Sequence, residues 1–185
     1  VYKRQNADIA FVNGGGIRKQ IEAGDITLDD IYSVHPFGNT MCVIRVTGQQ
    51  VLDALEWGAR AVPSENGGFL QVSGLTYEIH TGVASSAEKD ENGMFTRVSG
   101  EYRVKNVMVG GQPLELDKTY TLASHNYMLL GHGDGYTMFD GCEVLGEDMM
   151  VDNQVLITYI TTTLGGVVGE QYANPYGDGR IVAVE

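Results

Sequence analysis

The stretch Ala7-Asp8-Ile9-Ala10-Phe11-Val12-Asn13-Gly14-Gly15-Gly16-Ile17-Arg18 decides how the N-terminal part of the chain folds. Residues 8–12 form a short apolar run closed by three glycines, which is typical of a buried strand that enters a loop. Because glycine has no Cβ, such a loop lets the backbone approach a ligand closely, and Arg18 is suited to fork onto phosphate oxygens. The residues alone also allow a flexible turn with a surface arginine. They match neither the Walker loop nor the Gly-x-Gly-x-x-Gly dinucleotide motif.

Two capping boxes predict helices downstream of this loop. The first, Thr27-Leu28-Asp29-Asp30, predicts a short helix that runs to about Val34. It should stop at the turn His35-Pro36-Phe37-Gly38-Asn39, because a residue before proline avoids the helical conformation. The second, Thr47-Gly48-Gln49-Gln50, predicts a longer amphipathic helix that ends before Pro63.

Strand-like runs alternate with these helices, at residues 41–46, 69–72, 75–79, 102–109, 112–116, 119–123 and 181–184. Gly110-Gly111 is a two-residue hairpin signal between two of them. Residues 81–100 are polar and predict a solvated loop, whose acids lack the spacing of a helix-loop-helix calcium site. Apolar residues from Val155 to Leu164 predict a last amphipathic helix, which Gly165 is placed to end. Hairpins and scattered helices favour an α+β fold, a mixed β-sheet with packed helices, over a doubly wound parallel sheet.

The length and net charge of the chain limit the number of domains and the kinds of partner it can have. A chain of 185 residues fits one domain. Its formal net charge of -12 argues against nucleic-acid polymers as partners, but a small phosphate ligand needs only one or two arginines. No run of about 18 apolar residues is present, so no membrane span is predicted. We expect residues 1–5 to be a non-native or truncated start, because a strand-like segment follows almost at once.

The two cysteines leave two interpretations open. Cys42 lies in an apolar run, which favours a buried free thiol. A disulfide between Cys42 and Cys142 is the alternative, and two cysteines do not determine the redox compartment.

Three further residues could complete a ligand site with the glycine-rich loop. Phe37 in its turn and Tyr127 after the strand at 119–123 could clamp a planar ring from both faces. Asp134, between glycines, could accept hydrogen bonds from sugar hydroxyls. For each there is a structural alternative: Phe37 and Tyr127 as core residues, and Asp134 as a turn former.

Four ordered motifs then identify a resemblance. They are the stretch from Ala7 to Arg18, His35-Pro36-Phe37-Gly38-Asn39, Gly68-Phe69-Leu70-Gln71-Val72-Ser73-Gly74 and Gly133-Asp134-Gly135-Tyr136. Together they resemble the C-terminal domain of the 5'-nucleotidase / UDP-sugar hydrolase / 2',3'-cyclic-nucleotide phosphodiesterase family. The resemblance covers residues 6–185 and implies a 5'-nucleotidase C-terminal domain-like fold.

The resemblance implies a role for each matched residue. Asn13 and Gly16 would contact the nucleoside, and Arg18 would face the substrate phosphate. Phe37 and Tyr127 would sandwich the base, Asn39 would hydrogen-bond near it, and Asp134 would hold the ribose hydroxyls. The chain departs from the family pattern in three ways: Tyr127 stands where phenylalanine is more usual, the spacing from Tyr127 to Asp134 is one residue longer, and His132 replaces a small residue.

The resemblance also implies where catalysis would occur. The family hydrolyses phosphate esters at a two-metal centre in an N-terminal metallophosphatase domain of the same polypeptide, and we expect that domain to be absent from this chain. No catalytic residue, metal ligand or cofactor is therefore assigned to this chain, and two divalent metal ions are implied for the other domain. The resemblance further implies an extracytoplasmic location. Two alternatives are a stand-alone nucleotide- or sugar-binding module without hydrolase activity, and a structural domain with a degenerate pocket.

Overall fold

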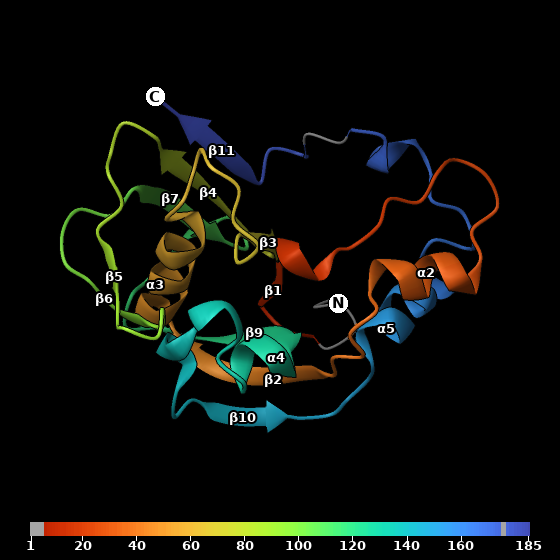
Figure 1. The fold of residues 1–185 in the computed structure, drawn as a ribbon, viewed down its shortest axis with the longest axis horizontal. Helices are drawn as coiled ribbons and strands as arrows, with labels where there is room; N and C mark the ends of the chain where they lie inside the picture. Colours follow the sequence, from red (N-terminus) through yellow and green to blue (C-terminus); the bar gives the residue numbers. More distant parts are fainter. Residues whose placement is uncertain (1–5, 175–176) are drawn as a thin grey trace.

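The computed structural model of the chain describes residues 6–174 and 177–185, so the expected non-native start at residues 1–5 lies outside the described residues. Figure 1 shows the arrangement of the elements. The strands are β1 (Ile9–Asn13), β2 (Met41–Thr47), β3 (Leu70–Ser73), β4 (Leu75–His80), β5 (Ala87–Lys89), β6 (Phe95–Val98), β7 (Val104–Val109), β8 (Gln112–Pro113), β9 (Thr119–His125), β10 (Glu143–Gly146) and β11 (Ile181–Val184). The helices are α2 (Leu28–Val34), α3 (Gly48–Ala59), α4 (Asn126–Leu129) and α5 (Asp152–Thr158). Shorter helical turns are η1 (Gly14–Gly16), η2 (Gly133–Gly135), η3 (Thr137–Phe139), η4 (Tyr159–Thr163) and η5 (Glu170–Tyr172).

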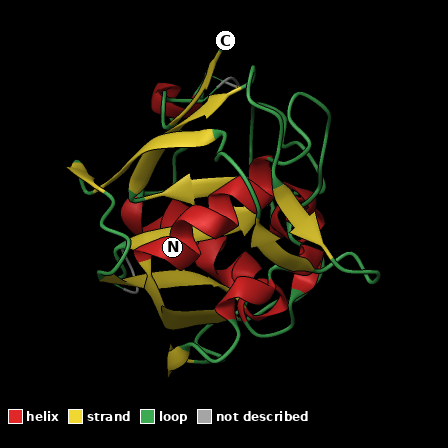
Figure 2. Cartoon of the chain, turned by 90° about the vertical axis from the view of Figure 1, so that its left-hand side faces the viewer, coloured by secondary structure: helices red, strands yellow, loops and turns green. Residues whose placement is uncertain are grey.

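The strands pair into two main sheets and a hairpin (Figure 2). The five-stranded sheet has the order β10-β2-β9-β1-β3, and only the β9–β1 pair in it is parallel. The four-stranded sheet has the order β11-β4-β7-β8, with β11 parallel to β4. Both sheets are thus mixed, and the predicted α+β class is confirmed. The tight Ser73-Gly74 bend carries the chain from one sheet to the other.

The hydrophobic core consists of two clusters, because side chains along a strand point alternately to the two faces of the sheet. In β1, Ile9 and Phe11 point into the larger hydrophobic cluster, whereas Ala10 points into a smaller one. Successive side chains of a strand face opposite sides of the sheet, so this pattern places packed layers on both faces. Helix α3 fills the larger cluster with Leu55, Trp57 and neighbouring residues, and α5 contributes Val155 to the smaller one.

Both predicted capping boxes are present. The Thr27 side chain accepts from the Asp30 backbone N–H while the Asp30 carboxylate accepts from the Thr27 N–H, and Thr47 and Gln50 do the same at the start of α3. Each box satisfies backbone donors that the first helical turn leaves without partners. The predicted end of α3 before Pro63 is confirmed.

The predicted last helix is also present, with a change in its final turn. It begins at Asp152 as α5 and continues as the π-helical turn η4. Gly165 follows with a positive φ of 68°, as a helix-ending glycine should. Among the described residues no helix is long and apolar enough to cross a membrane.

The prediction of a solvated loop over residues 81–100 is wrong in part. Residues 87–89 and 95–98 pair as the antiparallel hairpin β5–β6. Phe95 anchors this hairpin: it is buried and meets the Trp57 ring edge-on, with centroids 5.7 Å apart. Asp90 orders the turn by accepting from the backbone N–H groups of Asn92 and Met94. The local sequence does not reveal the hairpin because its strands carry no alternating apolar run: Phe95 is buried in the larger cluster, and only Ala87 and Val98 of the hairpin pack against it.

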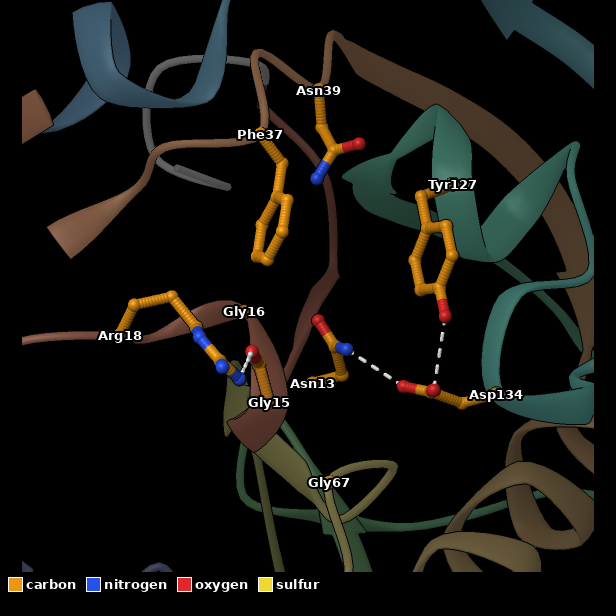
Figure 3. A pocket seen from close by; sticks show the side chains of 9 residues that line it. All are labelled: Asn13, Gly15, Gly16, Arg18, Phe37, Asn39, Gly67, Tyr127 and Asp134. Atoms are coloured by element: carbon orange, nitrogen blue, oxygen red, sulfur yellow. Dashed lines mark hydrogen bonds between the residues drawn. The ribbon is translucent and has the colours of Figure 1, made fainter. Parts of the chain in front are cut away.

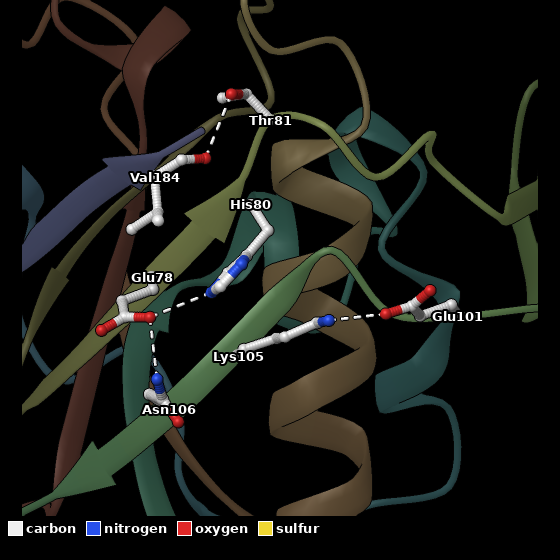
Figure 4. A network of polar contacts seen from close by, with 7 residues as sticks. All are labelled: Glu78, His80, Thr81, Glu101, Lys105, Asn106 and Val184. Carbon is white, nitrogen blue, oxygen red and sulfur yellow. Dashed lines mark hydrogen bonds and ion pairs between the residues drawn. The ribbon is translucent and has the colours of Figure 1, made fainter.

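Polar contacts tie together the strands of the four-stranded sheet (Figure 4). The Glu78 carboxylate on β4 contacts His80 Nε2 at 3.0 Å and accepts from Asn106 Nδ2 on β7 at 2.8 Å. Just beyond β4, the Thr81 hydroxyl donates to the carbonyl of Val184 at 3.1 Å, which fastens the end of β11.

The two cysteines are free thiols, so the disulfide alternative is wrong. Cys42 is buried in β2, and burial raises its thiol pKa to about 12. A thiol is nucleophilic only as the thiolate, so this residue serves packing. Cys142 is half-buried and accepts from Gln50 Nε2 at 3.3 Å.

Candidate functional site

All seven residues predicted to form the site line one pocket of about 540 Å³ (Figure 3). They come from separate segments: the end of β1 with η1, the turn after α2, α4, and η2. The lining residues are Asn13, Gly15, Gly16, Arg18, Phe37, Asn39, Gly67, Tyr127 and Asp134. The fold thus assembles residues that lie up to 121 positions apart.

The glycine-rich loop lies directly against the segment that precedes β3. The Gly14 N–H donates to the Phe69 carbonyl and the Gly15 N–H to the Gly67 carbonyl, each at 2.8 Å. Gly16 must lack a side chain, because a Cβ there would lie 2.8 Å from Asn13 Oδ1. The bare backbone therefore forms one wall of the pocket, with Asn13 packed beneath it.

Arg18 stands at one end of the pocket. Its Nη1 donates to the Gly15 carbonyl at 3.2 Å, and its guanidinium carbon lies 5.9 Å from the centre of the Phe37 ring. Of the described residues that line the pocket, Arg18 alone carries a positive charge. A guanidinium held in this way leaves further N–H groups able to bind an anion.

Phe37 and Tyr127 stand on opposite sides of the pocket with their rings exposed to it (Figure 3). Phe37 is 59% exposed and Tyr127 41% exposed, so the alternative that either is a core residue is wrong. At such exposure, part of each ring surface is open to the pocket and can contact a ligand. Burial, followed by the hydrogen bond to Asp134, raises the pKa of Tyr127, whose hydroxyl thus stays protonated at neutral pH.

Asp134 receives donors on both carboxylate oxygens. Asn13 Nδ2 donates to its Oδ2 at 2.7 Å, and the Tyr127 hydroxyl donates to its Oδ1 at 3.0 Å. Its backbone carbonyl accepts from Trp57 Nε1 at 2.9 Å, which fixes the loop to α3. The carboxylate is thereby held at the opposite end of the pocket from Arg18.

The loop around Asp134 has an unusual backbone path. His132 and Asp134 both adopt left-handed backbone conformations, with φ of 54° and 55°. Gly133 between them leaves room for the Tyr127 ring, which a Cβ at that position would overlap. His132 Nε2 contacts Asp140 Oδ1, and His132 does not line the pocket.

The sequence reasoning missed three residues of this region. Gly15 and Gly67 line the pocket through their backbones, and the dipeptide Gly67-Gly68 was the available signal for the second. His125 lies under the pocket, where its Nε2 contacts Asn13 Oδ1 at 3.2 Å. Nothing in the local sequence pattern separates it from an ordinary core histidine.

No group of three or more His, Cys, Asp or Glu side chains in the described part of the chain is arranged to hold a metal ion. His125 contacts Asn13 and His132 contacts Asp140.

A family model described as "5'-nucleotidase, C-terminal domain" matches residues 2–141. The trifunctional nucleotide phosphoesterase protein YfkN of Bacillus subtilis is 35% identical over 178 residues, which cover 96% of this chain and 11% of that protein. A 5'-nucleotidase of Vibrio vulnificus is 32% identical over 158 residues, covering 85% of this chain and 25% of the relative.

A solved structure gives the same result. The 5'-nucleotidase precursor from Thermus thermophilus superimposes with a TM-score of 0.79 at 31% sequence identity, covering 99% of this chain and 32% of that one. The chain thus spans a quarter or less of the curated relatives named above and about a third of this structure.

Proposed function

The chain belongs to the family of 5'-nucleotidase C-terminal domains, and on that premise we propose that it is the substrate-recognition part of a phosphoric ester hydrolase. In this proposal it binds the nucleoside or nucleotide, placing the base between Phe37 and Tyr127. The observation that carries the proposal is the pair of exposed rings on opposite sides of one pocket. Stacking on an aromatic side chain is worth about 1–3 kcal/mol per base.

The two ends of the pocket suit the two ends of a nucleotide. Arg18 supplies charge-assisted hydrogen bonds of the kind that phosphate oxygens accept. Asp134, at the other end, offers carboxylate oxygens that sugar hydroxyls can donate to. Asn13, Asn39 and the backbone at Gly16 add polar contacts along the wall between them.

We place catalysis in another part of the longer polypeptide. The relatives are named as phosphoesterases and 5'-nucleotidases and are four or more times longer than the matched region. Two divalent metal ions in an N-terminal metallophosphatase domain would activate water and stabilise the leaving oxygen there. That domain is the proposed partner of this chain, and an extracytoplasmic location goes with the same proposal.

Binding and hydrolysis test the two halves of the proposal separately. Calorimetric titration of the chain should show binding of adenosine and AMP, and much weaker binding of ribose 5-phosphate, which has no base to stack. Absence of heat with adenosine and AMP, from protein that is folded by circular dichroism, would remove the recognition role. Incubation with AMP and Mg²⁺ or Mn²⁺ should release no phosphate, and robust turnover would refute the division of labour.

The alternative of a stand-alone binding module predicts the same binding results, and it differs in the sequence expected upstream of this chain. Asp-x-His and Gly-Asn-His-Glu motifs in the preceding reading frame would support the hydrolase, since these residue types ligate paired metal ions. Their absence would favour the module. The degenerate structural domain instead predicts that Phe37→Ala changes no binding.

A further inference from the structure

We propose that His125 is a positioning residue for nucleoside recognition, which fixes the direction of the Asn13 amide and, through it, the Asp134 carboxylate. The inference rests on the proposed function of the pocket. His125 does not line the pocket itself, and its hydrogen-bond contact with a lining residue is the one with Asn13. Its ring also lies 6.0 Å from the Tyr127 ring, so the test must separate the two routes.

Strand pairing brings the two side chains together. β1 and β9 are parallel neighbours, with Ile9 opposite Leu122 and Ala10 opposite Ala123. Asn13 is the last residue of β1 and His125 the last residue of β9, so both lie at the same end of these parallel strands. Both are buried, at 5% and 3% exposure, which removes water as a competitor for their hydrogen bond.

The contacts of Asn13 distinguish the two ends of its amide. Nδ2 donates to Asp134 Oδ2 at 2.7 Å, and Oδ1 faces His125 Nε2 at 3.2 Å. A reversed amide would set its oxygen against the carboxylate and its N–H₂ against a ring N–H. An amide oxygen cannot donate, so the imidazole must carry its proton on Nε2 for this contact to be a hydrogen bond.

The surroundings of the imidazole favour this neutral Nε2–H form. Its Nδ1 has no hydrogen-bond partner among the described residues. The contact of Nε2 with Asn13 is therefore the one that fixes the orientation of the ring. Burial lowers the pKa of His125, so the ring stays neutral near pH 7. A small cavity of about 130 Å³ behind the ring is lined in part by His35 and Asp152. The titratable groups that face the ring are His35 from the turn after α2, Asp152 from α5, Tyr127 from α4 and Asp134 from η2.

The donors run in one direction through the network. His125 donates to Asn13, Asn13 donates to Asp134, and Tyr127 donates to Asp134 from the other side. Loss of the first donor frees the amide of Asn13 to rotate and leaves its oxygen buried without a partner. The carboxylate that is proposed to receive the ribose would then lose its fixed orientation.

A double-mutant cycle measures whether His125 acts through Asn13. His125→Leu should weaken adenosine binding about fivefold, within the range of one net hydrogen bond. His125→Gln, whose amide nitrogen can take the place of Nε2, should stay within about twofold of wild type. In an Asn13→Ala background, His125→Leu should change the affinity by less than about twofold, because the residue it acts through is gone. The same loss in both backgrounds would overturn the inference, since it would indicate a merely structural role.

The ring tautomer gives a second readout that needs neither a variant nor a ligand. Long-range ¹H–¹⁵N NMR spectra of the wild-type chain should show the proton of His125 on Nε2. A proton on Nδ1 would overturn the inference even if His125→Leu fails to fold. If the wild-type chain binds no nucleoside while the Nε2–H tautomer is present, the proposed function fails and the positioning of Asn13 stands.

Discussion

The amide nitrogen of Asn13 lies 2.7 Å from Oδ2 of Asp134, although 121 residues separate the two in the sequence. The contact closes the pocket floor between the first strand and the loop after α4. It also positions Asp134 beside Tyr127, so the polar and the aromatic parts of the pocket are not independent.

Replacing Phe37 with alanine should weaken adenosine binding by about 1–3 kcal/mol, because it removes one stacking surface. The melting temperature should stay unchanged, since a ring that is 59% exposed contributes little to the core. Phe37→Tyr is the matched control and should bind like wild type. Calorimetry and thermal unfolding check both parts, and unaltered affinity in Phe37→Ala would exclude stacking at this position.

Tyr127→Phe should keep or strengthen adenosine binding, by up to about 1.5 kcal/mol. The ring remains for stacking, and Asp134 Oδ1 loses the tyrosine hydroxyl with which a ribose hydroxyl must compete. For 2',3'-dideoxyadenosine, which has neither hydroxyl, the same change should leave the dissociation constant unaltered. Equal weakening for both ligands would mean that the Tyr127 hydroxyl supports the base and not the sugar end.

Arg18→Ala should weaken AMP binding by about 1.5–3 kcal/mol, because a charge-assisted hydrogen bond to phosphate is lost. Adenosine has no phosphate, so its affinity should change far less. Arg18→Lys keeps the charge and should recover part of the loss without the forked geometry. Equal losses for AMP and adenosine would show that Arg18 acts by supporting Phe37, which its guanidinium contacts.

Gly16→Ala should reduce adenosine affinity about tenfold or more, because the new Cβ would press on Asn13 Oδ1 and displace the amide. Gly14→Ala is the matched control within the same triplet, since its Cβ would meet the Phe69 carbonyl at an ordinary 3.5 Å. Comparable losses in both variants would point to a general need for flexibility in the loop. Titration of both proteins with adenosine separates the two cases.

The free energy of unfolding should fall as the pH drops below about 6.5. Burial lowers the pKa of both His35 and His125, whereas in the unfolded chain these groups titrate near 6.5. At a pH between the folded and unfolded pKa values, the unfolded state binds more protons than the folded state, so lowering the pH favours unfolding. Each histidine should lower the free energy of unfolding by at most about 1.4 kcal/mol per pH unit. Urea unfolding from pH 5.5 to 7.5 measures the slope, and His125→Gln should reduce it. A flat profile in wild type would show that the two imidazoles titrate normally in the fold.

The sequence predicted the parts of the fold that depend on local chemistry. The capping boxes at Thr27 and Thr47 could be read because each uses a side chain three residues from its partner. Six of the seven predicted pocket residues could be named because they lie in the ordered motifs, and Tyr127 could be named as the aromatic residue that follows the strand at 119–123. The family resemblance is confirmed, as is the α+β class, while the roles of the pocket residues stay predictions.

What the sequence did not predict depends on contacts between distant segments. The hairpin β5–β6 rests on Phe95 meeting Trp57, a pairing that no local period reveals. The contact of His125 with Asn13 requires β1 and β9 to be neighbours, although the two residues lie 112 positions apart in the sequence. Gly67 enters the pocket only because Gly15 bonds to its carbonyl.

The exposure of Phe37 and Tyr127 has an evolutionary consequence. Phe37 lies in the turn after α2 and Tyr127 in the short helix α4, and neither belongs to the two hydrophobic clusters, so replacing them should leave the packed layers intact. Substitutions at such positions are close to neutral for folding. On the proposed function, a lineage could therefore alter which bases the pocket accepts one mutation at a time, without passing through a poorly folded intermediate. The buried Asn13 and His125 lack that freedom, and the sugar end should diverge more slowly than the base end.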